Sequence, residues 1–121
     1  MYQSIVVGTD GSEKDLAVVR RAVELAGRLG GTVHIAHGFK PVTSIAAGIA
    51  DSAPGASTVD FEALDEAIDA ENEHVMGDAA AIAQAAGVTV TTHAMAGEPA
   101  EVLCDLAREV GGDLIVIGNH G

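Results

Sequence analysis

Apolar residues along this chain follow two spacings, one typical of strands and the other of helices. Short apolar or alternating runs predict strands, and apolar positions that recur every three or four residues predict helices. In chain order, the pattern predicts strands at Ile5–Val7, Thr32–Ala36, Val88–Met95 and Leu114–Ile117, and helices over 13–30, over 61–86 and from Pro99 to the Gly111-Gly112 pair.

Residues 39–59 break this alternation, because Phe39-Lys40-Pro41 is followed by a run rich in Ala, Gly, Ser and Thr. We predict a loop here. A loop of this length usually either carries function or lacks fixed structure. The segment follows the carboxyl end of a strand, so it could cover a ligand, and the sequence favours neither reading.

Strands that alternate with helices are typical of an α/β domain, in which right-handed crossovers cover a parallel sheet. There is no repeat and no linker, so we expect one domain over residues 1–121. The alternating run Val88–Met95 suits an edge strand, and the wholly apolar Leu114–Ile117 suits a central one. A central strand is normally followed by a helix and another strand. We therefore expect a unit of roughly 20–30 residues to be missing after Gly121.

Composition and charge narrow the function. The chain has 121 residues, 48% of them hydrophobic, and a formal net charge of −12 with only six Lys and Arg residues. Such an acidic chain lacks the basic face that nucleic acids or anionic membranes require. It has a single cysteine, Cys104, no apolar run long enough to span a bilayer and no signal-peptide core. These features predict a soluble, cytoplasmic protein.

Two glycine loops, each following an apolar strand, are the strongest candidates for a binding site. The first contains Gly8-Thr9-Asp10-Gly11, and the second is Gly118-Asn119-His120-Gly121. Ser12 is placed to cap the following helix, with Asp15 at the reciprocal position of a capping box. The ends of the first and fourth strands meet at a switch point in doubly wound sheets. We expect a pocket there, lined by backbone amides of both loops, for a phosphate-bearing small molecule.

The two histidines near the second strand invite a metal hypothesis. His34 and His37 are separated by an odd number of residues, so their side chains point to opposite faces of a strand. This favours two hydrogen-bonded strand histidines over a metal pair.

The order of these motifs along the whole chain resembles the universal stress protein family. The matching pieces are Ile5–Ser12, His34–His37, Gly97–Ala100 and Asp113–Gly121. The resemblance implies a Rossmann-like open parallel sheet of strand order 3-2-1-4-5 with helices on both faces. It also implies an adenine-nucleotide site, with ATP the expected ligand, and a homodimer. Carried across residue by residue, the resemblance assigns nucleotide contacts to Gly8, Thr9, Asp10, Gly38, Gly118 and Gly121, with Asn119 and His120 between the last two.

Several alternatives stay open from the residues alone. Asp10 could help to hold Mg²⁺ through the phosphates, or it could be a turn residue at the helix entry, and the two roles are compatible. We expect a regulatory nucleotide-binding module with no catalytic residues and at most slow ATP hydrolysis. The alternative is a non-nucleotide interaction module of the same fold. A phospho-receiver domain ranks lower, because Met95-Ala96-Gly97 stands where its acidic residue is needed.

Overall fold

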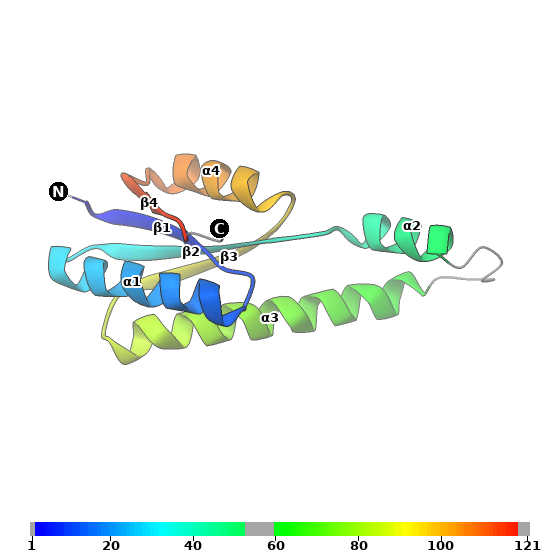
Figure 1. Cartoon of the computed structure of the whole chain (residues 1–121), viewed down its shortest axis with the longest axis horizontal. Coiled ribbons are helices and arrows are strands. Elements are labelled where there is room, and N and C mark those ends of the chain that lie inside the picture. Colours follow the sequence, from blue (N-terminus) through cyan, green and yellow to red (C-terminus); the bar gives the residue numbers. More distant parts are fainter. Residues whose placement is uncertain (1, 53–59, 119–121) are drawn as a thin grey trace.

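The computed structural model of the chain describes residues 2–52 and 60–118. Eight elements are described, and the predicted strands and helices are all among them (Figure 1). In chain order they are β1 (Ser4–Gly8), α1 (Glu13–Leu29), β2 (Thr32–Phe39), α2 (Val42–Ser52), α3 (Phe61–Ala85), β3 (Val90–Ala96), α4 (Pro99–Val110) and β4 (Leu114–Val116).

The four strands form one parallel sheet in the order β3-β2-β1-β4, which confirms the predicted order for these strands. β2 pairs with β3 over seven residue pairs, from Val33–Val90 to Phe39–Ala96. β1 pairs with β4 over only three, from Ile5–Leu114 to Val7–Val116. β1 and β2 are the inner strands of the described sheet. Each contains consecutive buried residues, as expected from the apolar runs in their sequences.

Helices cover both faces of the sheet. Figure 1 shows α1 and α3 on one face and α4 alone on the other. Side chains of a strand point alternately to its two faces, so Ile5 and Val7 pack toward α1 and α3 while Val6 packs toward α4. The fold is therefore the three-layer α/β arrangement that the sequence pattern predicts.

The ends of the helices follow the sequence signals. Ser12 caps α1 by accepting the Asp15 amide proton on its hydroxyl, and Asp60 caps α3 in the same way through Ala63. α1 and α4 both end at a glycine in the left-handed conformation, Gly30 and Gly111, which a residue without a side chain adopts at little cost.

The prediction of a loop over 39–59 is wrong for most of that segment. β2 continues to Phe39, and α2 occupies Val42–Ser52, while 53–59 lie outside the described residues. α2 does carry a short apolar stripe at helical spacing, formed by Val42, Ile45, Ala46 and Ile49, which the prediction of a loop overlooked, although Ala46 is its only buried residue. It packs against the first part of α3, and Figure 1 shows both projecting beyond the sheet.

The predicted apolar stripe of the second long helix holds only in its later part. Phe61 is 51% exposed, whereas Asn72 and the buried residues after it cover the sheet. The first turns of α3 lie past the end of the sheet, beside α2. None of the helices among the described residues is both long enough and apolar enough to cross a membrane.

Of the two edge strands of the described sheet, only one was predicted to be an edge strand. β3 lies at an edge, as its alternation predicts, with mostly exposed or half-buried residues. β4 also lies at an edge of the described sheet, although its composition predicts a central strand. As a result, Ile115 is 39% exposed and Ile117 just after the strand is 74% exposed.

Candidate functional site

A cavity of about 350 Å³ opens at the carboxyl ends of the strands, a volume that suits a small-molecule ligand. It lies where α/β sheets bind ligands, beside the switch point between β2-β1 and β4. Its walls come from the ends of three strands and the starts of two helices: Gly8, Thr9, Asp10, Asp15, Ala36, His37, Gly38, Pro99, Ala100, Leu103, Val116, Ile117 and Gly118.

The structure brings five predicted site residues together around this cavity, namely Gly8, Thr9, Asp10, Gly38 and Gly118. They belong to segments far apart in the chain, so their convergence is a property of the fold. Asn119, His120 and Gly121, which are also predicted to contact a nucleotide, lie outside the described residues.

The two glycines that end β1 and β2 have different structural reasons for lacking a side chain. A Cβ at Gly38 would lie 2.9 Å from the Gly97 carbonyl oxygen and 3.1 Å from the Cα of Pro99, which are both backbone atoms. Gly38 thus lets the turn before α4 pass against β2. A Cβ at Gly8 would instead meet the side chain of Leu103 at 3.3 Å, and Leu103 itself lines the cavity.

Backbone amides of the first loop are already engaged within the chain. The Thr9 amide donates to the Ala36 carbonyl at 2.9 Å, and the Gly11 amide donates to the Thr9 hydroxyl at 3.1 Å. The Asp10 amide donates to the Asp15 carboxylate at 2.9 Å, and the Ser12 amide to the Asp10 carboxylate at 2.8 Å. The amides from Thr9 to Ser12 therefore already have partners within the chain, and their predicted contact with a phosphate stays a prediction.

What this loop presents to the cavity is negative charge. Hydrogen bonds from the Ser12 side chain and then its backbone lower the pKa of Asp10, so its carboxyl group is ionised at neutral pH. Asp15, the predicted capping-box partner of Ser12, reaches the Asp10 amide instead of the Ser12 amide. Both carboxylates belong to the cavity wall.

His37 is buried in the same wall and forms a hydrogen bond with the backbone of the first loop. Because the Thr9 carbonyl oxygen can only accept, the contact of 2.9 Å means that Nδ1 of His37 donates to it. His34 lies on the opposite face of β2, where Nδ1 is 2.7 Å from the Thr91 hydroxyl, which also lies 2.9 Å from Nε2 of His93. The prediction of two hydrogen-bonded histidines on opposite faces is confirmed. Over residues 2–52 and 60–118, no three His, Cys, Asp or Glu side chains gather in a way that could hold a metal ion.

Comparison with known proteins decides the family. The profile of the universal stress protein family matches residues 1–121, the whole of the sequence. A universal stress protein of Mycobacterium tuberculosis is 31% identical over 121 residues, which are 99% of this chain and 77% of that protein. The chain belongs to the universal stress protein family.

Solved structures of this family share the fold. A universal stress protein in complex with cAMP is 29% identical, with a TM-score of 0.64 over 94% of this chain and 70% of the other. The universal stress protein of Archaeoglobus fulgidus in complex with dAMP is 26% identical, with a TM-score of 0.66 over 96% and 80%. Both are adenine-nucleotide complexes of similar proteins, and they support the identification of the fold made from the sheet order.

Some lining residues of this universal stress protein were not predicted as site residues. Asp15, His37 and Leu103 each face the cavity from an element whose type the sequence predicts. The capping-box spacing singled out Asp15, and the strand reading singled out His37, but neither signal assigned a ligand. Leu103 has no such signal, because one apolar position of an amphipathic helix looks like any other.

Proposed function

We propose that this universal stress protein binds an adenine nucleotide in the cavity at the carboxyl ends of β1, β2 and β4, and acts as a regulatory module in a stress response. The convergence of Gly8, Thr9, Asp10, Gly38 and Gly118 on one cavity carries the proposal. The cAMP and dAMP complexes of similar proteins support it.

ATP is the ligand that we propose, with Mg²⁺ as its companion ion. Asp10 would hold the ion through the phosphates, because Mg²⁺ favours one or two carboxylates together with phosphate oxygens. The ionised carboxyl group of Asp10 in the cavity wall fits this role. We assign no catalytic residue, and any hydrolysis of ATP would be slow.

Calorimetric titration of the chain with ATP, ADP, AMP and cyclic AMP tests the proposal directly. Saturable binding of at least one adenine nucleotide is expected. If none binds, the alternative of a protein-interaction module gains support, since Ile49 and Phe61 on the projecting α2 and α3 are 38% and 51% exposed.

Gly8→Val connects the binding to this cavity. Its Cβ would push against Leu103, so the larger side chain narrows the cavity from two sides while leaving the backbone of β1 in place. We expect nucleotide affinity to fall at least about tenfold, or about 1.4 kcal/mol. Gly77→Val is the matched control, because Gly77 is exposed on α3 with no atom within 4 Å of its added Cβ. Equal affinity in Gly8→Val and the wild type would contradict the assignment of the site.

The proposal extends to a cytoplasmic homodimer, as the family resemblance implies. Ile115 and Ile117, which are 39% and 74% exposed beside the edge of β4 in the part of the sheet that the structure describes, support association through an apolar surface. Sedimentation at several protein concentrations tests it, and a monomer at every concentration would contradict it.

A further inference from the structure

We propose that His34 and His93 bind a divalent transition-metal ion, such as Zn²⁺, Ni²⁺ or Cu²⁺, between the strands β2 and β3. The two histidines lie on the same face of the sheet as Val6 and Ala36, against which α4 packs. Neither histidine lines the cavity described above, so the ion would occupy a second site. The proposal does not depend on which nucleotide the cavity binds.

The register of β2 and β3 brings the two imidazole rings together. Thr91 of β3 lies opposite His34 of β2, and His93 lies opposite Ala36. Residues two apart on a strand share a face, so Thr91 and His93 project from the same side of the sheet as His34. The ring centres of His34 and His93 are 6.3 Å apart. Two imidazoles, which are good ligands for transition metals, therefore meet across one pair of strands.

Both rings turn a nitrogen toward the same point. Nδ1 of His34 is 2.7 Å from the hydroxyl oxygen of Thr91, and Nε2 of His93 is 2.9 Å from the same oxygen. A hydroxyl group has a single hydrogen to donate, so it cannot satisfy two unprotonated nitrogens at once. A cation at this point can, because it accepts a lone pair from each neutral ring.

The distance between the rings fits one bridging ion. A Zn–N bond is about 2.0–2.1 Å long, which puts the ion roughly 3 Å from the centre of each imidazole ring. Two rings on one ion can therefore have centres up to about 6 Å apart. The observed 6.3 Å is close to that limit, so a small rotation of the rings brings both nitrogens into range. Thr91 is exposed and can turn aside as the ion enters.

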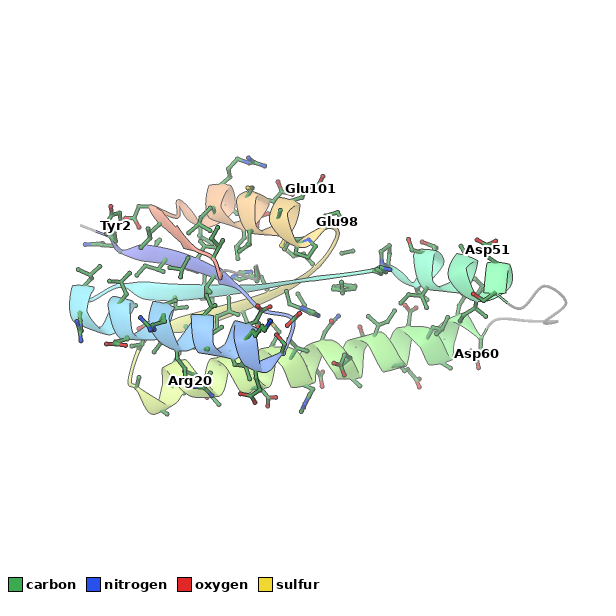
Figure 2. The ribbon with its side chains drawn as sticks, viewed as in Figure 1. Tyr2, Arg20, Asp51, Asp60, Glu98 and Glu101 are labelled. Carbon is green, nitrogen blue, oxygen red and sulfur yellow. The ribbon has the colours of Figure 1, made fainter. Side chains whose placement is uncertain are left out.

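The acidic side chains of the chain do not complete a different cation site. Figure 2 shows Glu98 and Glu101 at the start of α4, and Asp51 and Asp60 where α2 ends and α3 begins. Within the described ranges 2–52 and 60–118, no three His, Cys, Asp or Glu side chains gather to hold an ion. The proposed site thus offers two nitrogen ligands, and water fills the remaining positions. Such a site favours Cu²⁺, Ni²⁺ and Zn²⁺ over Mg²⁺ and Ca²⁺, which prefer oxygen.

Calorimetric titration of the whole chain, without a histidine tag, with Zn²⁺ and then with Ni²⁺ tests the proposal. We expect saturable binding that an excess of Mg²⁺ does not change. The electron paramagnetic resonance spectrum of the chain loaded with Cu²⁺ should show coupling to two imidazole nitrogens. If none of the three ions binds saturably, the proposal is overturned.

Histidine variants connect the ion to this strand pair. His34→Asn and His93→Asn each remove one of the two nitrogen ligands, and each should weaken Zn²⁺ binding at least about tenfold. His74→Asn is the matched control, because His74 is an exposed histidine on α3 whose Nε2 lies 3.4 Å from the Asp78 carboxylate. Cys104→Ser removes the exposed thiol, which is another possible zinc ligand. Both controls should bind Zn²⁺ as the wild type does.

Thermal melts supply a second readout. An ion that binds the folded chain raises its Tm, so Zn²⁺ should stabilise the wild type and both controls, but neither His34→Asn nor His93→Asn. Melts in EDTA show that each variant folds, and His93 lies on the edge strand, where a substitution disturbs the core least. A Zn²⁺ response that persists in both of these variants, or that is lost in His74→Asn or Cys104→Ser, would overturn the assignment.

Discussion

The two faces of the sheet are packed very differently. Thirteen buried residues fill the space between the sheet and α1 and α3, whereas four buried residues, Val6, Ala36, Val102 and Leu106, lie between the sheet and α4. One face is thus covered by a continuous aliphatic core, and the other by a single amphipathic helix over a small cluster.

The candidate site lies at the carboxyl ends of the strands, and part of its wall comes from the thinly packed α4 side. Gly8 and Gly38 open toward Leu103 and Pro99 of α4, and these residues form part of the cavity wall. Regions with few buried apolar contacts open at lower free energy than the rest of a domain. The comparison indicates that, among the described residues, the α1–α3 face contributes more buried apolar contacts to stability than the α4 face.

Truncating one fully buried residue on each face tests this comparison most strongly. Ile35→Ala in the larger core should lower the free energy of unfolding by about 3–5 kcal/mol, because its surroundings are buried on all sides. Leu106→Ala should cost less, about 2–3 kcal/mol, since the smaller cluster can relax into the space. Urea unfolding of both variants measures the difference, and a larger cost for Leu106→Ala would reverse the assignment of the two faces.

Filling space under α4 gives a smaller effect. A Cβ at Gly112 would lie 2.8 Å from Cγ2 of Val6 and 3.3 Å from the Cα of Ala107, so Gly112→Ala forces the end of α4 away from β1. We expect a loss of about 1–3 kcal/mol, as in other overpacked sites. Gly77→Ala, on the exposed side of α3, meets no atom within 4 Å and should stabilise the chain by about 0.5–1 kcal/mol. A neutral Gly112→Ala would show that the α4 layer moves freely.

Acid should weaken the connection between β1 and the start of β4. The Asp113 carboxylate accepts the Gln3 amide at 3.0 Å and the Ser4 amide at 3.1 Å. These bonds, from Gln3 first, lower the pKa of Asp113 below its ordinary value of 3.8. Its contribution is therefore complete at neutral pH and is lost as the pH falls through 3.8 and below. Asp113→Asn should flatten this acid limb in a series of thermal melts, and an unchanged limb would contradict the role.

The smallest expected effect is also a pH effect, on the α4 side of β2. Partial burial, and then the charge of His93, lower the pKa of His34 below its ordinary value of 6.5. The unfolded chain then takes up a proton that the folded chain resists, so stability decreases as the pH falls through 6.5 and below. His34→Asn should reduce this slope between neutral pH and mild acid. Melts that show the same slope in variant and wild type would contradict it.

Much of the fold could be predicted, because some residues strongly favour one secondary structure. Ile5-Val6-Val7 can only be an inner strand, and Ser12 and Gly30 mark the two ends of α1. The site was predictable as a place, because parallel strands bring Gly8, Gly38 and Gly118 to one edge. α2 was missed although Val42, Ile45, Ala46 and Ile49 recur at helical spacing, because the segment is also rich in Gly, Ser and Thr, which favour a loop.

The hydrogen bonds within the first loop could not be predicted from the sequence either. A glycine loop before a helix looks the same whether its amides are free or engaged. Only the positions of Asp10 and Asp15 show that their carboxylates take up the Ser12 and Asp10 amides. Thus the sequence predicted that Gly8, Thr9 and Asp10 meet Gly38 and Gly118, but not that the loop amides have partners within the chain.

The pairing of β1 with β4 has a consequence for how the protein is made. Asp113 bonds to Gln3 and Ser4 across 110 and 109 residues of sequence, so β1 leaves the ribosome long before the strand β4 that pairs with it. At usual translation speeds the wait is roughly 5–20 s. During that time β1 can pair with β2, but its other edge, carrying Ile5, Val6 and Val7, stays open. A nascent chain that has not yet reached Leu114 therefore presents an apolar strand edge of the kind that chaperones bind.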